Sequence, residues 1–516
     1  MLKVVASFWM RRLVTIFSFA LVVLAAVSAC STPKTEKTHE ADKHGASPGL
    51  RGAWKSDGYG FVFIANGDTL QAYEVTQTTC VPSLKMTRRA ETAAGVEAVH
   101  AKDDEVFLVR ATPDSNEKRL HSDGSASDMV IHRIAARPAT CDPPTPNSPE
   151  GNFDVFAQTW GEHYISFDEK GANWPAVVAK ARAKVTPTTK PEELFEIFQE
   201  MIAPFEDAHT MIRAESIKRR YHGLRKGTDR LAKHGFDDFK TKDLPPVLAV
   251  TNSKLHGPLR KWCNDQVQYG HLDDSTGYLR ILSEWGYAKA GDFTAGLVAL
   301  EAALDTIFTD PKLKGLVIDV RINSGGYDPY GLALASRLAT SDYVAYSKEA
   351  RIDPVDRTKW TPGQPSFVRP STRPGFKGPV VELTGPLTIS AGETTTQALM
   401  GRTPKVARIG ENTQGVFSDI LFRTLPNGWR FGLPNEVFRS PEGKTFDGPG
   451  IPPDIAVPVF ADRDLAAGRD PGLERARTEL DRNRHPERGA SLTASPFRHF
   501  LVAAQPAVQA VLEDQP

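Results

Sequence analysis

Between Gly277 and Met400 the chain alternates strand-like and helix-like segments, and this alternation constrains its fold more than any other feature. Continuous apolar runs predict three buried strands, at residues 278–282, 316–320 and 380–383. Amphipathic or helix-compatible stretches predict three helices, at residues 297–308, 329–338 and 391–400. Such alternation predicts crossover connections around a largely parallel sheet. Chemistry in such a sheet gathers where strand ends lead into helix N-termini.

Segments with other sequence patterns flank this α/β core, so we expect a multidomain chain. Short strand-like runs with hairpin signals such as Asn66-Gly67 predict an all-β module. A helical periodicity that stops at Pro204 predicts a helical subdomain, whereas residues 212–262 show no clear pattern. The predicted divisions are a signal peptide at 1–29, a flexible tether at 30–49, a small β module at 50–146, a helical subdomain with an unassigned connection at 147–276, the α/β core at 277–460 and a C-terminal helical tail at 461–516.

The first residues have the order of a secretory signal. Lys3, Arg11 and Arg12 form a basic segment, and an apolar run follows that is short for a bilayer-spanning helix. Residues 31–49 are polar and rich in Pro, Gly and Thr, which is typical of a solvated tether.

The end of this signal indicates where the protein resides. Val27-Ser28-Ala29-Cys30 resembles a bacterial lipobox, in which Cys30 would be lipidated. A non-lipidated signal cleaved nearby is the alternative. Ser31, rather than Asp, after the cysteine favours outer-membrane sorting. We therefore expect an exported bacterial cell-envelope protein, anchored by its lipid in the outer membrane and facing the periplasm.

The cysteine and charge content indicate which cysteines pair and which ligands the protein is not expected to bind. Cys80 and Cys141 bracket the β module, so we favour them as the disulfide pair in an oxidising compartment, with Cys263 left over. No cysteine spacing resembles a zinc site, and we expect no metal or other cofactor. The chain has 63 basic and 63 acidic residues, which gives no long-range attraction for nucleic acid.

Two strand-to-helix turns carry candidate chemistry. Asn323-Ser324-Gly325-Gly326 follows a buried strand, and its glycines can bring backbone N–H groups close to a ligand. Ser390 lies at the foot of the predicted 391–400 helix, where the positive helix field favours a nucleophile whose attack creates an oxyanion. A capping box formed by Ser390 and Glu393 is the structural alternative. His209 is the candidate base, although spacing alone does not join it to Ser390.

Taken together, these motifs resemble the tricorn-core and C-terminal-processing (tail-specific) serine peptidase family. The matching segments, in order, are Glu206-Asp207-Ala208-His209-Thr210, Leu316 to Gly326, Thr388 to Glu393, Gly410 to Gly415, Gly450 to Ile455 and Asp470 to Ala476. The resemblance covers about 152–210 and 277–480 and implies a core of the ClpP/crotonase-like type. It implies a serine peptidase that cleaves peptide or protein substrates.

The resemblance also assigns roles to residues. It implies that Ser390 attacks the peptide carbonyl and that His209 takes its proton. Asp447 occupies the place of the acid that orients the histidine, where the tricorn-like branch usually has Glu; Asp207 is a substitute. N–H groups of Gly325 or Gly326 and of Ala391 would bind the oxyanion.

One position separates the two branches of this family. The processing peptidases use a Ser–Lys dyad, whose lysine follows a glycine that here is Gly415. The next residue is Val416, which cannot accept a proton, and Lys405 lies in the wrong segment. The sequence therefore favours the tricorn-like Ser–His arrangement. Two other hypotheses stay open: a non-catalytic protein that binds apolar ligands on the same fold, and a structural envelope lipoprotein in which Ser390 only caps a helix.

Overall fold

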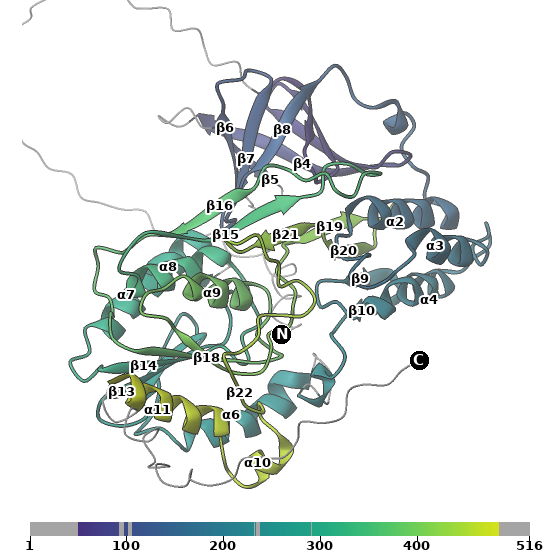
Figure 1. The fold of residues 1–516 in the computed structure, drawn as a ribbon. Helices are drawn as coiled ribbons and strands as arrows, with labels where there is room; N and C mark the ends of the chain where they lie inside the picture. Colours follow the sequence, from purple (N-terminus) through teal and green to yellow (C-terminus); the bar gives the residue numbers. More distant parts are fainter. Residues whose placement is uncertain are drawn as a thin grey trace, which may run out of the picture.

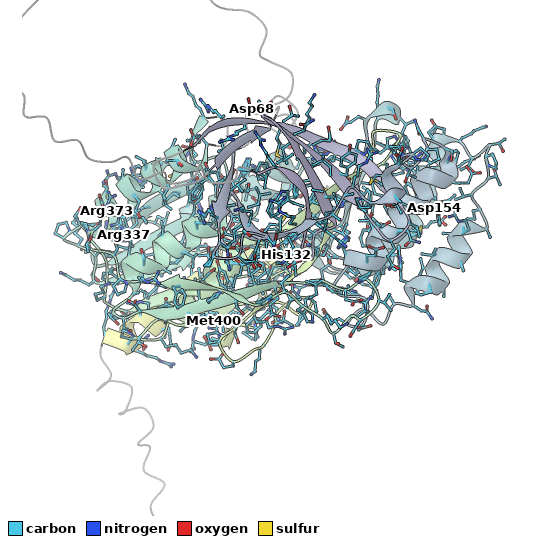
Figure 2. All side chains as sticks on the ribbon, turned by 90° about the horizontal axis from the view of Figure 1, so that it is seen from above. Asp68, His132, Asp154, Arg337, Arg373 and Met400 are labelled. Atoms are coloured by element: carbon cyan, nitrogen blue, oxygen red, sulfur yellow. A yellow bond between two sulfur atoms is a disulfide. The ribbon has the colours of Figure 1, made fainter. Side chains whose placement is uncertain are left out.

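A computed structural model describes residues 50–91, 97–101, 106–231, 233, 238–289 and 292–484. A β-barrel lies above the α/β core, and a group of helices lies at one side (Figure 1). Seen from above, the barrel, which carries Asp68 and His132, lies between Asp154 of the helical group and Arg337 of the core (Figure 2). The predicted signal peptide and tether, with Cys30, fall outside the described residues.

The N-terminal module is a closed, antiparallel barrel of eight strands. Its strands are β1 (Gly52–Ser56), β2 (Phe61–Asn66), β3 (Thr69–Val75), β4 (Cys80–Glu91), β5 (Glu97–Ala101), β6 (Val106–Ala111), β7 (Glu117–Ser122) and β8 (Met129–Ile134). Pairing of β1 with β8 closes it, and Trp54, Phe63 and Leu70 fill its interior. The Asn66-Gly67 signal marks the β2–β3 hairpin, where Gly67 has a φ of 58°.

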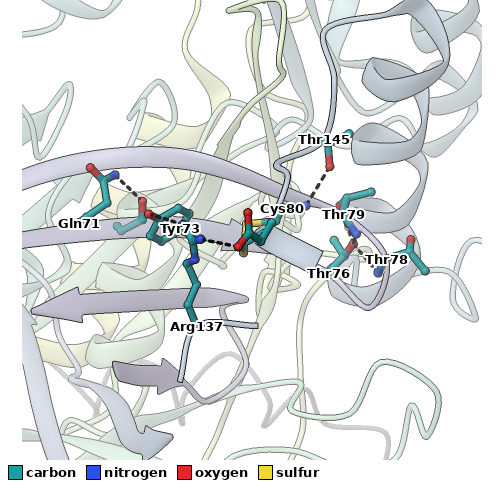
Figure 3. The surroundings of a disulfide bond; sticks show 11 residues. Gln71, Tyr73, Thr76, Thr78, Thr79, Cys80, Arg137 and Thr145 are labelled. Carbon is teal, nitrogen blue, oxygen red and sulfur yellow. Dashed lines mark hydrogen bonds and ion pairs between the residues drawn. A yellow bond between two sulfur atoms is a disulfide. The ribbon is translucent and has the colours of Figure 1, made fainter. Parts of the chain in front are cut away.

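A disulfide fastens the barrel to the segment that leaves it. Cys80, at the start of β4, is bonded to Cys141, and both residues are buried. The Cys80 N–H donates to the Thr145 hydroxyl at 2.9 Å, which adds a second tie to the same segment (Figure 3). Cys263 is a free, buried cysteine.

The helical group packs on a small antiparallel sheet. Its helices are α2 (Pro149–His163), α3 (Trp174–Arg182) and α4 (Pro191–Ile202), and the sheet has the order β10 (Arg219–His222), β9 (Met211–Ala214), β20 (Arg430–Pro434) and β19 (Ile420–Thr424). The apolar faces of the helices meet the sheet in an aromatic core. Phe156 stacks on Phe198 with ring centroids 4.2 Å apart, and Phe431 of β20 lies 5.0 Å from Phe156.

The core contains a mixed sheet of seven strands, five of which run parallel. The order is β11 (Arg260–Trp262), β12 (Val267–His271), β13 (Thr276–Ile281), β14 (Gly315–Asp319), β17 (Val380–Thr384), β18 (Ala407–Gly410) and β22 (Ile455–Ala456). Helices α7 (Phe293–Phe308), α8 (Asp328–Leu338) and α9 (Ala391–Met400) lie on the crossovers that join its parallel strands. The predicted α/β core with a largely parallel sheet is thus confirmed, with an antiparallel pair at one edge.

Alternate residues of each central strand face different layers. Leu316 and Ile318 of β14 pack with the α7–α9 side, whereas Val317 packs against Leu473 and Leu480 on the other side. Those leucines belong to α11 (Pro471–Arg484), which follows the short α10 (Asp462–Ala466). Because both faces are covered, the strands carry continuous apolar runs rather than an alternating pattern.

Residues 212–262, which the sequence left unassigned, form short pieces rather than one domain. They include β9, β10, α6 (Leu244–Asn252) and β11. Beneath the barrel lies a further antiparallel sheet, with the order β16 (Gln364–Val368), β15 (Tyr343–Ala350) and β21 (Glu436–Arg439) (Figure 1). Within the described ranges, no helix combines the length and apolar character needed to cross a bilayer.

We expect removal of the disulfide to destabilise the protein. The bridge closes a loop with a sequence separation of 61. On the chain-entropy estimate, a loop of this size contributes about 4 kcal/mol. The double variant Cys80→Ser/Cys141→Ser should therefore unfold at lower urea concentration than the unchanged protein. A reductant should lower the midpoint of the unchanged protein only; equal midpoints for both oxidised proteins would contradict this role.

Candidate active site

Ser390 lies on a strained turn between β17 and α9. Its φ of 56° and ψ of −120° are unusual for a residue with a side chain, and such a conformation costs about 1–3 kcal/mol. A helix cap alone does not need this strain, because N-cap residues ordinarily have extended backbones. The turn resembles the strand-to-helix elbow that presents nucleophiles in hydrolases. The Ser390 N–H donates to the Glu393 carboxylate at 3.2 Å, so part of the capping box is also present.

The glycine turn after β14 lies directly against Ser390. A Cβ on Gly325 would come within 2.7 Å of the Ser390 Cβ and 3.1 Å of the Ala391 nitrogen. The Gly325 N–H already donates to the Asn323 side chain at 2.8 Å. Within the described part of the chain, the N–H groups of Gly326 and Ala391 donate to no protein acceptor. These two groups, rather than Gly325, are therefore available for an oxyanion.

Glu284 fixes the position of this turn, and the sequence analysis did not identify it. Its carboxylate accepts hydrogen bonds from the Asn323 amide at 2.8 Å and the Thr395 hydroxyl at 3.1 Å. Its backbone pairs with the glycine turn: the Glu284 N–H donates to the Gly325 carbonyl at 2.9 Å. Burial raises the pKa of Glu284 to about 7. Glu284 belongs to no motif, so only the fold connects it to the turn.

A second loop passes on the other side of Ser390. We call residues 413–419 the strap. The Glu393 carboxylate accepts the Gly415 N–H at 2.7 Å and the Val416 N–H at 2.9 Å, in addition to the Ser390 N–H. Burial raises the pKa of Glu393 to about 8. Glu393 therefore connects the turn that carries Ser390 to the strap.

His209 is buried beside the far end of the strap. Its backbone N–H donates to Asp207 at 2.8 Å, and the other oxygen of Asp207 accepts the Tyr164 hydroxyl at 3.1 Å. Burial, reinforced by His222, lowers the pKa of His209 to about 4, while Asp419 and the backbone of Ser418 act in the opposite direction. The imidazole is therefore neutral at pH 7. Its Nδ1 atom has no hydrogen-bond partner among the described residues.

The fold brings His209 and Ser390 to the same region without a hydrogen bond between them in the described structure. Ala208 and Ile389, their chain neighbours, pack in one apolar cluster with Val416 of the strap. The strap thus has contacts to both regions, to the Ser390 turn through Glu393 and to His209 through Ser418.

Asp447 accepts a hydrogen bond from the middle of the strap. One carboxylate oxygen accepts the Phe417 N–H at 3.1 Å, and the other accepts the Thr445 hydroxyl at 2.8 Å. Burial, with contributions from Asp207 and Glu169, raises the pKa of Asp447 to about 7. In the part of the chain that the structure describes, no hydrogen bond joins Asp447 to His209.

The groups that would support a Ser–Lys dyad or a metal site were also located. Lys405 is exposed and pairs with Asp454 at 2.7 Å. Val416 is buried. Across the described residues, no group of three or more His, Cys, Asp or Glu side chains is arranged to hold a metal ion.

An exposed indole flanks the glycine turn. Trp285 follows Glu284, is 46% exposed, and lies 4.8 Å from the Tyr327 ring. An ideal Cβ on Gly326 would lie 2.6 Å from the Trp285 nitrogen, so the tryptophan and the turn are immediate neighbours. A large apolar side chain is therefore accessible beside the free N–H of Gly326.

The raised pKa of Glu284 predicts a pH-dependent stability. Because the folded carboxyl binds its proton more tightly than the unfolded one, its contribution is complete below about pH 4.5 and is lost as pH rises through about 7. The contribution is at most about 3 kcal/mol. Glu284→Gln keeps an acceptor for Asn323 and cannot ionise. Its urea midpoint should therefore vary less between pH 5 and 8 than that of the unchanged protein, and an unaltered pH dependence would refute the assignment.

Two family models match this chain. Residues 275–457, which hold both Ser390 and the glycine turn, match peptidase family S41. Residues 145–203, which hold the helical group, match the tricorn protease C1 domain. No curated protein sequence matches the chain.

Several solved structures are similar to this chain, and the first of them shares its fold. A candidate peptidase from Parabacteroides merdae is 24% identical, with a TM-score of 0.54 over 65% of this chain and 97% of that chain. Mature CPAF with lactacystin is 12% identical, with a TM-score of 0.47 over 65% and 98% of the two chains. Tricorn protease is 14% identical, with a TM-score of 0.39 over 82% and 45%. By its two model matches and the order of its motifs, the central part of the chain is similar to peptidase family S41 and to the tricorn protease C1 domain.

Proposed function

We propose that this protein hydrolyses peptide bonds through an acyl-enzyme on Ser390, with His209 as the general base. The observation that carries the proposal is the strained Ser390 beside two unengaged N–H groups, those of Gly326 and Ala391. Such preorganised donors stabilise a developing oxyanion by about 3 kcal/mol each. The strand–turn–helix setting of Ser390 also supports our proposal that the core is of the ClpP/crotonase-like type.

In the proposed reaction, the Ser390 hydroxyl attacks the carbonyl carbon while His209 accepts its proton. The tetrahedral oxyanion binds the two N–H groups, and the protonated imidazole then donates its proton to the leaving amine. Water deacylates Ser390 by the same route in reverse. The neutral state of His209 at pH 7 supports this role, because a general base must be unprotonated before it accepts a proton.

The Ser–His arrangement is preferred over a Ser–Lys dyad for two reasons. In the sequence, Val416 follows Gly415, where the resemblance puts the dyad lysine, and its side chain has no proton acceptor. Lys405 is exposed and bound to Asp454. Asp447 in this proposal positions the strap through the Phe417 N–H instead of touching the imidazole.

The proposed substrate is a peptide or protein. An extended chain that placed its carbonyl at Gly326 would bring a neighbouring side chain toward Trp285, whose exposed indole favours apolar groups.

Replacements of the two candidate bases should separate the branches. We expect His209→Ala and Ser390→Ala each to lower kcat on a fluorogenic peptide mixture by about 10⁴-fold or more. Lys405→Ala removes only an exposed ion pair, so its kcat should stay within about 2-fold of that of the unchanged protein. The acidic limb of kcat/KM should lie near pH 4, because His209 must be neutral to act. Loss of activity in Lys405→Ala alone would return the protein to the dyad branch.

We further propose that the protein is exported and held by a lipid on Cys30, which the lipobox-like Val27-Ser28-Ala29-Cys30 supports. Cys30→Ala should move the protein from the membrane fraction to the soluble fraction of its cell envelope. Because the acyl chains supply the membrane affinity of a lipid-anchored protein, loss of the whole lipid group should release the protein. Unchanged fractionation would eliminate the anchor and leave the catalytic proposal intact.

A further inference from the structure

The barrel meets the rest of the protein through buried polar contacts as well as apolar ones, such as Val81 of β4. The Glu74 carboxylate accepts the Thr424 N–H of β19 at 2.8 Å, and the Asn435 amide donates to the Gly58 carbonyl at 3.3 Å. Glu74 is only 7% exposed. Separating the two parts would leave the interface charges without partners, so the barrel is an integral part of the fold.

One barrel loop, residues 57–60, inserts a tyrosine hydroxyl into the core. The Tyr59 hydroxyl donates to the Glu436 carboxylate on β21. The same carboxylate lies 3.2 Å from the Lys348 ammonium on β15, and both charged residues are buried. Burial and Glu436 raise the pKa of Tyr59, so this hydroxyl is a neutral donor.

Glu436 and Lys348 together hold the end of the strap. The second oxygen of Glu436 accepts the Asp419 N–H at 3.1 Å, and the Glu436 N–H donates to the Ser418 hydroxyl at 3.1 Å. Lys348 binds the Asp419 carboxylate at 2.5 Å. Ser418 and Asp419 are the strap residues that face His209. A continuous chain of contacts therefore runs from the barrel to the proposed base.

A second barrel loop, residues 123–128, reaches the other half of the site. Gly124 has a φ of 83°, and a Cβ there would lie 2.4 Å from the Tyr327 ring. Tyr327 directly follows Gly326, whose N–H is one of the two proposed oxyanion donors. The loop is fixed to β16 by Gln364, whose side chain exchanges two hydrogen bonds with the Asp128 backbone, at 2.9 and 2.7 Å.

We propose that the barrel is a positioning element of the active site. Through Tyr59 it holds the strap against His209, and through Gly124 it holds the glycine turn beside Ser390. This inference rests on the proposed peptidase function and goes beyond it, because it assigns a role to a domain that carries no catalytic residue.

The test breaks each contact in the full-length protein. Tyr59→Phe removes only the hydroxyl, and Gly124→Ala places a methyl group against Tyr327. Each variant should lower kcat on the peptide mixture, and the rate of Ser390 labelling by a fluorophosphonate, by about 10-fold. A displacement near 1 Å at a reacting group can cost about 100-fold. KM should change little, and the loss of kcat should persist at temperatures well below each variant's melting temperature, which a general loss of structure would not permit.

The barrel supplies a matched control for each variant. Tyr73→Phe removes a hydroxyl that, among the described residues, accepts a hydrogen bond from the Arg137 side chain alone, at 3.2 Å (Figure 3). Gly67→Ala introduces a methyl group at a similar backbone angle, φ 58°, with nothing within 4 Å. Both should retain the full rate of hydrolysis and labelling.

The outcomes separate the two proposals. An unchanged protein that neither hydrolyses peptides nor reacts with the fluorophosphonate would overturn the peptidase function itself. An active protein in which Tyr59→Phe and Gly124→Ala match their controls would overturn the barrel's role alone. If Tyr59→Phe lowers the melting temperature, Glu436→Gln provides a second break in the same chain of contacts, and an unaltered kcat in that variant would also refute the inference.

Discussion

The site depends on the hydrogen bonds that the buried carboxylate of Glu393 accepts. It accepts hydrogen bonds from the N–H groups of Ser390, Gly415 and Val416. These residues belong to two loops that are separate in the sequence. Each of these donors would otherwise be a buried, unpaired backbone group, at a cost of about 1–3 kcal/mol. Together with the Gln414 N–H, which donates to the Thr388 carbonyl at 2.9 Å, Glu393 fixes the strap relative to Ser390.

Buried carboxylates recur around this centre, and each fixes a loop: Asp207 and Asp447 accept backbone N–H groups, whereas Glu284 accepts the side-chain amide of Asn323. Glu284 holds the glycine turn, Asp207 holds the His209 backbone, and Asp447 holds the middle of the strap. Burial raises the pKa of all three, so their environment is poorly solvated. Polar interactions are stronger in such surroundings, which suits a site that must stabilise a transient oxyanion.

The sequence predicted those elements whose signals are local. The α9 boundaries at Ala391 and Met400, the α4 helix ending before Pro204 and the buried strand at 316–320 follow from periodicity and flanking residues. The motifs likewise located the turn that carries Ser390 and the glycine turn. By contrast, the contacts of Glu284 and of Tyr59 depend on partners distant in the chain, which no local pattern encodes. The choice of Gly326 over Gly325 depended on the hydrogen bond that the Gly325 N–H donates to the Asn323 side chain, which only the folded turn reveals.

The central claim is that Ser390, the N–H groups of Gly326 and Ala391, and His209 form one catalytic arrangement. A crystal structure of the protein after reaction with a fluorophosphonate tests it most directly. The account predicts a bond from the Ser390 Oγ to phosphorus, with the phosphonyl oxygen 2.7–3.1 Å from both N–H groups, the spacing typical of oxyanion donors, and with His209 contacting the adduct. An adduct on another residue, or a phosphonyl oxygen directed away from Gly326 and Ala391, would contradict it.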